Sequence, residues 1–401
     1  MILYTGSYNA PVLAGDGSVQ QGHGEGITLW SFDEDTGVLA RRKTYPEAQN
    51  ASWIALSKDG RTLFAVEELD SIRSGGKELD GGAVASWHID SADGTLWYIG
   101  MAPTYGAAPC HLSVRDCPCG SGGHLYAANY NGDEAGGSLM TAAYNADGRI
   151  DPESVITLRR RFTKSDLEAE GRDLKRQEKP HIHCAEVYRN WLFVNDLGRD
   201  STEVLRLKED GEIDRGQFLP LHSPEGCCSD GWFDRGSGPR SIAFGSRYVF
   251  VTEELADRIC VLAIEKLDRN YAEYGLRYVE EIPAVSPSSR SQGGLGGLVL
   301  SPDGRFLYAG SRGDNTIAVF AIREDGSEDA VLRPVQWIES GGSNPRGIAL
   351  SPGGGWLLAA NQDSDNIVSF RRDADSGMLT LNHETAAGAV VCFAFQKGQA
   401  V

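Results

Sequence analysis

One pattern recurs along the chain and limits its fold more than any other feature. An apolar stretch is followed by a turn of the Pro-Asp-Gly type and then by a second apolar stretch. Clear copies begin at Trp53, Gly297 and Arg346 and read WIALSKDGRTLFAV, GLVLSPDGRFLYAG and RGIALSPGGGWLLAA. Each copy predicts two antiparallel strands joined by a tight turn. A third apolar stretch follows each copy, and a fourth follows a further Gly-containing turn. Four antiparallel strands per repeat are typical of a β-propeller blade.

The repeats can be aligned on their first residues. These are Trp53, His111, His183, Arg240, Gly296 and Arg346, about 50 to 72 residues apart. A seventh unit combines an inner strand at 390–395 with strands at 2–8 and 26–32. The sequence therefore predicts an all-β, seven-bladed β-propeller whose closing blade is shared by the N- and C-termini, which leaves no free sheet edge. We expect a single domain over residues 1–401, with a short charged helical insert at 164–179.

Composition narrows the class of protein. Hydrophobic residues make up 41% of the chain, and the 49 glycines fall largely in turn-like clusters. The formal net charge is −18, which argues against a nucleic-acid partner. No apolar run approaches the length of a membrane span, and the N-terminus lacks the pattern of a signal peptide, so we expect a cytoplasmic protein without a membrane partner.

The chain has eight cysteines, at positions 110, 117, 119, 184, 227, 228, 260 and 392. Their spacing does not follow the C-x2-C pairs of a zinc ribbon. We therefore expect buried thiols in an intracellular protein.

Polar residues gather where the first two strands of each predicted blade meet. The start of the innermost strand and the end of its antiparallel neighbour lie at the same face, so two columns of side chains can be compared there. The residues at the starts of the innermost strands are the six first residues of the repeats named above. The residues at the ends of the second strands are Ser7, Glu68, Asn129, Asp196, Glu254, Arg312 and Asn361. A wet channel mouth accounts for some polarity, but this mixture of acids, cations and histidines favours a small-molecule site.

Four of these residues have side chains suited to catalysis. His183 is a candidate general acid or base, and Glu254 could hold a water or orient the histidine. Arg240 and Arg312 could bind a carboxylate or phosphate and stabilise an oxyanion. His111 is expected at a place equivalent to His183 in the adjacent blade. We predict that the remaining binding residues are His111, Arg346, Asn129, Glu68, Asp196, Asn361 and His181.

A metal site is the main alternative to this arrangement. His181 and His183 would face the same side of a strand, and Glu68, Asp196 and Glu254 could supply carboxylates. The further ligands that such a site needs are not evident in the sequence. We therefore predict no metal and no cofactor.

Several motifs resemble the lactonase-type seven-bladed propeller family. They are QEKPHIH at 177–183, NDLGRD at 195–200, GPR at 238–240, EEL at 253–255, LSPDGRFLY at 300–308, SRG at 311–313 and NPRG at 344–347. That family includes bacterial propeller 6-phosphogluconolactonases and fungal 3-carboxy-cis,cis-muconate lactonizing enzymes. The resemblance implies an active site of one histidine, two arginines and a glutamate, which by motif are His183, Arg240, Glu254 and Arg312. The chain departs from the family pattern at Ser241, where histidine is frequent, and at the segment 293–297, GGLGG.

The resemblance implies an enzyme that hydrolyses an anionic sugar lactone in the manner of 6-phosphogluconolactonase. One alternative is cycloisomerisation of a carboxymuconate, in which the same arginines would hold carboxylates. A further alternative is a non-catalytic propeller that binds a ligand or a protein, since a fold does not imply an activity. In each enzymatic case the partner is a small anionic molecule, and the oligomeric state stays open.

Overall fold

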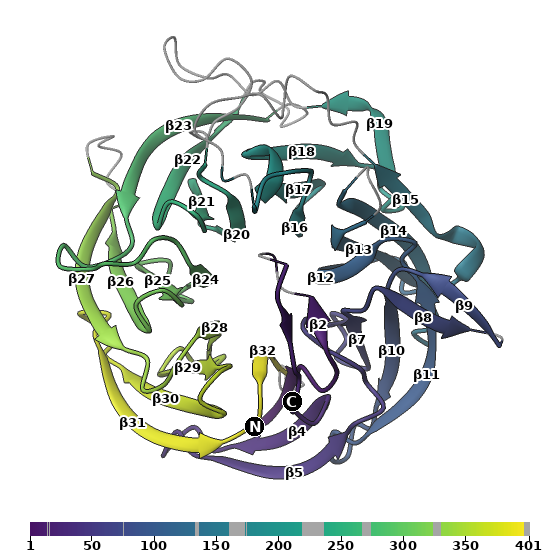
Figure 1. Ribbon diagram of the computed structural model, residues 1–401, viewed down its shortest axis with the longest axis horizontal. Coiled ribbons are helices and arrows are strands. Elements are labelled where there is room, and N and C mark those ends of the chain that lie inside the picture. The colour runs from purple at the N-terminus through teal and green to yellow at the C-terminus, as the bar shows by residue number, and fades with distance from the viewer. Residues whose placement is uncertain are drawn as a thin grey trace.

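The computed structural model describes residues 1–13, 15, 17–74, 76–132, 136–159, 173, 175–218, 236–266, 274–323 and 330–396. Within these residues the strands form seven four-stranded antiparallel sheets and two small two-stranded sheets. Figure 1 shows the seven sheets arranged as blades around a central axis. The predicted seven-bladed propeller is therefore confirmed.

The strands of each blade are given from the innermost strand outward. Blade 1 has β32 (Val390–Phe395), β1 (Ile2–Ser7), β4 (Ile27–Phe32) and β5 (Leu39–Tyr45). Blade 2 has β6 (Ile54–Leu56), β7 (Thr62–Glu67), β10 (Ala83–Ile89) and β11 (Leu96–Pro103). Blade 3 has β12 (Ala107–Asp116), β13 (Gly122–Asn131), β14 (Ser138–Asn145) and β15 (Ile156–Arg159). Blade 4 has β16 (Ile182–Tyr188), β17 (Trp191–Asp196), β18 (Ser201–Leu207) and β19 (Ile213–Phe218); blade 5 has β20 (Pro239–Phe244), β21 (Tyr248–Glu253), β22 (Arg258–Lys266) and β23 (Tyr274–Pro283). Blade 6 has β24 (Leu295–Leu300), β25 (Phe306–Ser311), β26 (Thr316–Ile322) and β27 (Leu332–Glu339); blade 7 has β28 (Pro345–Leu350), β29 (Trp356–Asn361), β30 (Asn366–Arg372) and β31 (Leu379–Ala386).

The two ends of the chain close the ring, as predicted. In blade 1 the last strand β32 pairs with the first strand β1, and Leu3 lies opposite Phe395 on one side and Trp30 on the other. In Figure 1 the yellow β32 lies beside the purple β1. This pairing satisfies backbone groups that an open ring would leave exposed at two sheet edges.

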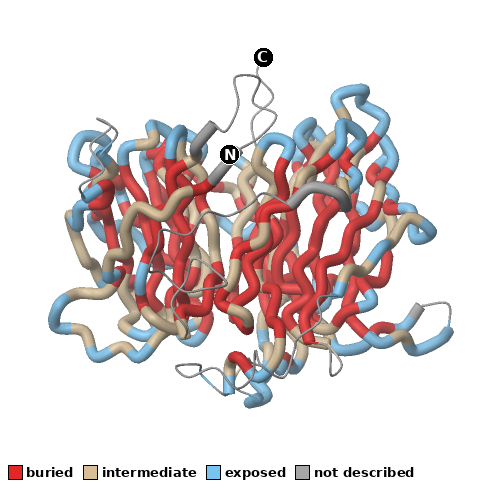
Figure 2. The backbone as a smooth tube through the Cα atoms, turned by 90° about the horizontal axis from the view of Figure 1, so that it is seen from above, coloured by how far each residue is buried: buried red, intermediate tan, exposed pale blue. Residues whose placement is uncertain are grey.

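The turns and the core explain why these segments form blades. In the first hairpin of blade 2, Ser57 Oγ donates to Asp59 Oδ1 at 2.6 Å and Gly60 adopts φ +68°, a conformation that glycine accepts without strain. The apolar faces of adjacent blades pack together, with Trp30, Trp87, Phe250 and Phe320 fully buried. Figure 2 shows buried residues along the strands and exposed ones mainly in the turns.

Smaller elements complete the described structure. They are two hairpins, β2 (Val12–Leu13) with β3 (Val19–Gln20) and β8 (Ser71–Ser74) with β9 (Lys77–Asp80), and two 3-10 turns, Pro152–Ser154 and Leu197–Arg199. Most of the predicted helical insert at 164–179 lies outside the described residues, and its final residues 175–179 form turns rather than helix. Among the described residues, no helix has the length and hydropathy needed to cross a membrane.

Candidate active site

The innermost strands share an irregularity that shapes the centre of the molecule. The pairing register shifts at the same place in β12, β16, β20, β24 and β28, just after the strand begins. A bulge of this kind bends a strand and redirects a side chain. The residues at the bulges are Cys110, His183, Arg240, Gly296 and Arg346. This inner layer lies between two cavities, because Cys110, His183 and Arg346 line both.

The bulges correct one prediction. His111 was expected at the place equivalent to His183, but the residue at the bulge in β12 is Cys110, and the counterpart of His111 is Cys184. His111 therefore lies one residue further along its strand. There it stacks on Trp53, with ring centroids 4.3 Å apart, and its Nε2 lies 3.3 Å from Glu186 Oε2. His111, Trp53 and Glu186 all line the larger cavity of about 860 Å³, which occupies the channel beyond the inner layer.

The smaller cavity, of about 180 Å³, is the channel mouth. Glu68, Glu254 and Arg312 line it, and each lies one residue beyond the end of a second strand. Two tyrosines occupy the same position in other blades, Tyr8 after β1 and Tyr130 after Asn129 in β13. The predicted column therefore named the lining residue correctly in blades 2, 5 and 6, whereas in blades 1 and 3 the lining residue is the one that follows the expected strand end.

Three predicted binding residues face away from the mouth. Asn129, Asp196 and Asn361 each pair with the residue before a bulge, so their side chains alternate with those that line the cavity. Asn129 Nδ2 donates to Ser138 Oγ at 3.0 Å, Asp196 accepts from the His181 backbone N–H at 2.8 Å, and Asn361 donates to the carbonyl of Ser340 at 3.0 Å. The predicted column therefore combined two different positions of the blade.

His181 is also placed behind the mouth. Its ring stacks on Tyr130 at a centroid distance of 4.4 Å, and its Nε2 lies 3.2 Å from both oxygens of Glu178. It does not line the mouth cavity. Its ring instead packs against Tyr130, which does line the mouth.

Glu254 is the centre of an ion cluster at the mouth. Its Oε1 lies 2.7 Å from Nη2 of Arg176 and 2.7 Å from Nη2 of Arg312, and its Oε2 lies 2.7 Å from Arg240 Nε. The Arg240 contact is an ion pair without hydrogen-bond geometry. Burial alone raises the pKa of Glu254, but Arg312, Arg176 and Arg240 outweigh it and hold the pKa well below its usual range. Glu254 is therefore ionised at neutral pH.

His183 lies beside this cluster. Burial, reinforced by the charge of Arg240, lowers its pKa well below the usual value although Glu254 opposes the effect. Its Nδ1 lies 3.7 Å from Cys110 Sγ, and its ring meets Tyr130 edge-on at 5.4 Å. At neutral pH His183 is therefore an uncharged imidazole, able to donate and to accept a hydrogen bond.

A second carboxylate lies on the other side of the ring, in blade 2. Tyr8 Oη donates to Glu68 Oε2 at 2.9 Å, and the guanidinium of Arg346 lies over the Tyr8 ring at 5.3 Å. Burial raises the pKa of Glu68, and Arg346 and the Tyr8 hydrogen bond only partly oppose this. The mouth thus holds two buried carboxyl groups whose environments shift their pKa values in opposite directions.

Sequence comparison places the chain in a known family. A family model described as "Lactonase, 7-bladed beta-propeller" matches residues 3–395. The chain belongs to this lactonase family. A 6-phosphogluconolactonase of Bacillus subtilis (strain 168) is 28% identical over 375 residues, which cover 92% of this chain and 94% of the relative. A 6-phosphogluconolactonase of Formosa agariphila is 29% identical over 363 residues, covering 89% and 91%.

Solved structures agree with this assignment. A periplasmic gluconolactonase of Pseudomonas aeruginosa superposes with a TM-score of 0.76 at 28% identity, over 99% of each chain. A crystal structure of a putative 6-phosphogluconolactonase from Bacteroides fragilis has a TM-score of 0.76 at 24% identity, over 98% of this chain and 97% of the other, and shows the shared fold. The family resemblance seen in the motifs is therefore confirmed.

Some mouth residues of this lactonase-family propeller were missed from the sequence. Tyr8 and Tyr130 could have been found by moving the expected strand end one residue further in blades 1 and 3. Arg176 and the hairpin β2–β3 could not, because they reach the mouth from segments outside the repeat. In Figure 1 the segment that carries β2 extends toward the centre of the ring.

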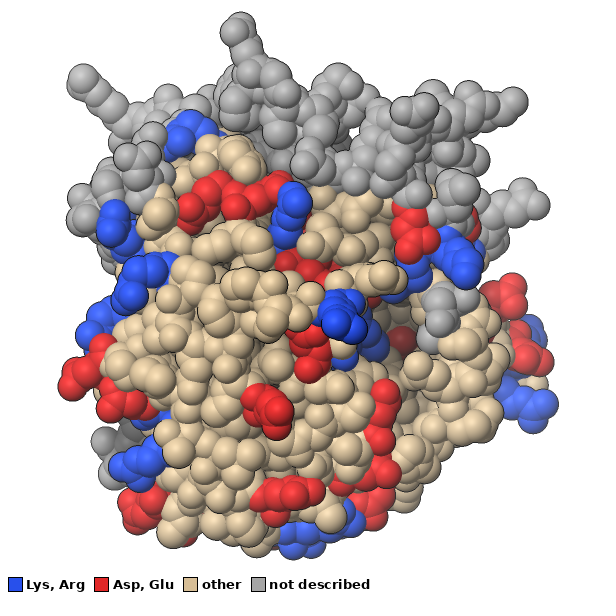
Figure 3. All heavy atoms as spheres, turned by 60° about the vertical axis from the view of Figure 1, so that its left-hand side comes forward, with Lys and Arg blue, Asp and Glu red and all other residues tan. Residues whose placement is uncertain are grey.

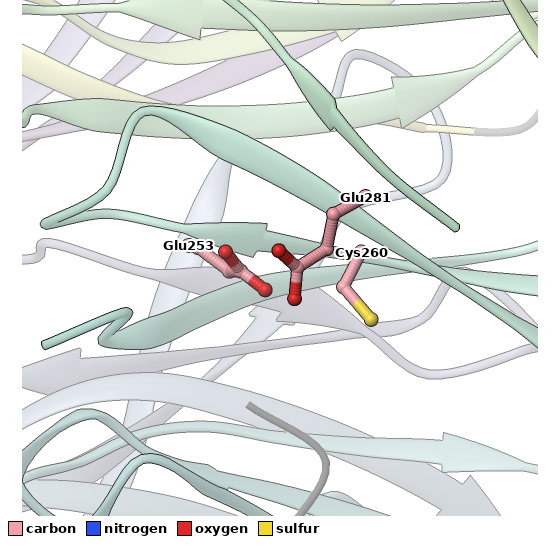
Figure 4. A group of neighbouring side chains, drawn as sticks. All are labelled: Glu253, Cys260 and Glu281. Atoms are coloured by element: carbon pink, nitrogen blue, oxygen red, sulfur yellow. The ribbon is translucent and has the colours of Figure 1, made fainter. Parts of the chain in front are cut away.

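A cluster of metal-ligating residue types in the lactonase-family propeller lies away from the mouth. Among the described residues, the group with metal-ligand spacing is Glu253, Cys260 and Glu281, whose donor atoms lie within 4.8 Å of one another. Figure 4 shows the two carboxylates pointing toward each other from strands of blade 5. Glu281 also pairs with Arg258 at 3.1 Å. This group does not line the mouth cavity, and the metal set considered around His183 is not formed by the described residues.

The cysteines divide into two kinds. Cys110, Cys184, Cys260 and Cys392 are buried free thiols, as expected. For Cys117 and Cys119 the expectation of buried thiols is wrong, because they form a disulfide in the turn between β12 and β13, where Cys119 is exposed. One residue, Pro118, separates them in sequence, so a tight turn brings them together. Cys227 and Cys228 lie outside the described residues.

Proposed function

We propose that this propeller hydrolyses the lactone of an anionic sugar, with 6-phosphogluconolactone as the leading substrate. One observation carries the proposal, which is the concentration of positive charge in the mouth of an acidic chain. Arg176, Arg312 and Arg346 line the cavity, and Arg240 contacts Glu254 beneath it. Four guanidinium groups face two carboxylates, in a chain whose formal net charge is −18.

This surplus suits an anionic substrate. Arginines keep their charge in proteins and bind phosphate or carboxylate through paired N–H groups. On the outer surface drawn in Figure 3, acidic and basic side chains are interspersed among neutral ones. The buried arginines of the mouth therefore distinguish this cavity from the surface around it.

The same groups suit the chemistry of lactone opening. When water attacks the acyl carbon, negative charge develops on the carbonyl oxygen. Fixed guanidinium groups in a water-poor cavity stabilise such an oxyanion strongly. Arg240 and Arg312 are held in place by Glu254, which keeps them ordered before the substrate arrives. The uncharged His183 can donate a hydrogen bond to the substrate without adding charge.

The test is a lactone hydrolysis assay with a matched pair of histidine variants. Wild type should open 6-phosphogluconolactone faster than the spontaneous rate, as measured by acid release at constant pH. His183→Ala should lower kcat/KM by about a hundredfold or more. His383→Ala is the control, because His383 is exposed on the outer strand β31 and should leave the rate unchanged.

A parallel assay addresses the cycloisomerase alternative. Four arginines could also hold a polycarboxylate, so carboxymuconate consumption is measured with the same preparations. Turnover of carboxymuconate without lactone hydrolysis would replace the proposal with that alternative. If neither substrate reacts faster than its spontaneous rate, the proposed function is wrong.

A further inference from the structure

The mouth contains two buried carboxyl groups, and their places in the ring separate them. Glu68 follows the second strand of blade 2, whereas Glu254 follows the second strand of blade 5. Two blades lie between them in one direction around the ring and three in the other, so they reach the same cavity from opposite walls. Lactone hydrolysis needs one group that removes a proton from water and returns it to the leaving oxygen. The contacts of the two carboxylates decide which of them is suited to this.

Both carboxylate oxygens of Glu254 are engaged in ion pairs with arginines. Both of its oxygens lie 2.7 Å from a guanidinium nitrogen, and Oε1 contacts two of them. Protonation of Glu254 would leave these cations with less compensating charge inside the protein, which is costly. Glu254 is therefore a fixed counter-ion that holds three arginines around the cavity.

Glu68 has a different surrounding. Its Oε2 accepts a hydrogen bond from Tyr8, and no ion pair to either oxygen occurs among the described residues. Arg346 is the cation with the largest electrostatic influence on Glu68, and its guanidinium lies over the Tyr8 ring. Glu68 is also 6% exposed and lines the mouth cavity. This carboxylate can gain and lose a proton without disturbing an ion cluster.

We propose that Glu68 is the general base of the lactone hydrolysis, while Glu254 serves as the anchor of the arginine cluster. The inference rests on the proposed function. As water forms a bond to the acyl carbon, Glu68 takes one of its protons. As the bond between the acyl carbon and the ring oxygen breaks, that oxygen takes the proton back from Glu68. The product is a hydroxy acid, which releases its second proton to solvent, and Glu68 returns to its starting form.

The protonation behaviour of the two carboxyl groups agrees with this division. Burial raises the pKa of Glu68 and so makes it a stronger base, while the arginines lower the pKa of Glu254. Two carboxyl groups with opposite shifts in one site are typical of a pair with separate roles. The titratable and charged groups that face Glu68 are Tyr8 from β1's end, Cys392 from β32, Cys110 from β12, Arg240 from β20 and Arg346 from β28, and the Ser52 side chain lies beside it.

The test compares Glu68→Gln with Glu47→Gln, which removes the same charge from an exposed loop. For 6-phosphogluconolactone, Glu68→Gln should lower kcat by about a hundredfold or more, with KM changed by less than about threefold. The wild-type rate should fall at acidic pH as Glu68 becomes protonated, and this limb of the pH profile should be absent in the variant. Glu47→Gln should behave as wild type.

Two further variants keep the test decisive if Glu68→Gln folds poorly. Tyr8→Phe removes the hydrogen bond that favours the ionised form of Glu68, so the acid limb should move to higher pH. Glu68→Ala should regain activity when formate is added, because formate can replace the missing carboxylate. Glu254→Ala should not regain activity in this way, because its loss disorders three arginines.

The outcomes separate the inference from the function on which it rests. If wild type hydrolyses the lactone and Glu68→Gln keeps its kcat and its acid limb, Glu68 is not the base and the lactonase proposal stands. If wild type shows no hydrolysis above the spontaneous rate, the proposed function is wrong and the role of Glu68 is lost with it. A large loss of kcat together with formate rescue supports both.

Discussion

Two walls of one cavity give the same residue type two different environments. On the blade 5 wall, Glu254 contacts three guanidinium groups at 2.7 Å. On the blade 2 wall, Glu68 accepts a hydrogen bond from a tyrosine at 2.9 Å and has its cation further away. Both carboxyl groups are buried, so burial alone does not distinguish them. The difference teaches that the neighbours of a buried carboxyl group, more than its depth, decide whether it can exchange a proton.

The largest expected effect is on stability. Glu254→Gln leaves three arginines in the mouth without their shared counter-ion, and we expect a loss of about 3–5 kcal/mol in the free energy of unfolding. Glu68→Gln should change it by less than about 1 kcal/mol at neutral pH, since no ion pair is broken. Urea unfolding of both variants measures this contrast. Equal losses would contradict the division between the two walls.

A third buried carboxyl group extends this comparison, because it makes the stability of the protein depend on pH. Glu67 precedes Glu68 but belongs to the strand β7, and burial raises its pKa to about 7. Because the folded state then binds a proton more tightly than the unfolded state, stability falls as pH rises from about 4 to 7. Glu67→Gln removes this loss. We expect it to stabilise the protein by about 3 kcal/mol at pH 8 and to have no effect at pH 4, as measured by urea unfolding at the two pH values.

The hairpin that borders the mouth provides a smaller effect on binding. A Cβ atom on Gly15 would lie 2.7 Å from both Arg176 Nε and Tyr130 Oη. Gly15→Ala should therefore displace Arg176 from Glu254 and raise KM by about tenfold, with a smaller change in kcat. Gly355→Ala is the control, because a Cβ there meets nothing within 4 Å. An unchanged KM would show that the hairpin does not limit the substrate site.

The smallest effect tests the corrected place of His111. Its contacts are with Trp53 and Glu186 in the channel cavity, one residue away from the position of His183. His111→Ala should change kcat/KM by less than about threefold, in contrast to the loss expected for His183→Ala. A loss as large as that of His183→Ala would return His111 to the site and would extend the site into the channel.

The sequence predicted the ring well and the mouth in part. Repeated turns such as SPDG and alternating apolar residues carry the blade pattern, so seven sheets and the shared closing blade follow from local signals. His183, Arg240 and Arg346 were aligned correctly because their strands share the same bulge. His111 and Asn129 were misplaced because a shift of one residue turns a strand side chain to the other face. The sequence pattern does not mark where a register shift begins.

Contacts made by residues outside the blade repeat could not be predicted from the sequence. Arg176 lies outside the blade repeat, and its contact with Glu254 joins residues 78 positions apart. The opposite pKa shifts of Glu68 and Glu254 also depend on distances between blades, because each shift reflects which guanidinium groups lie near the carboxylate. Residue type and spacing along the chain do not fix these distances.

The measurement that tests the account most directly is the preference of wild type between two lactones. They are 6-phosphogluconolactone and gluconolactone, which differ only in the phosphate. If the surplus of guanidinium groups in the mouth binds an anionic substrate, kcat/KM should be at least about tenfold higher for the phosphorylated lactone, which corresponds to about 1.4 kcal/mol. Equal values, or a preference for gluconolactone, would contradict the assignment of this mouth to an anionic sugar lactone.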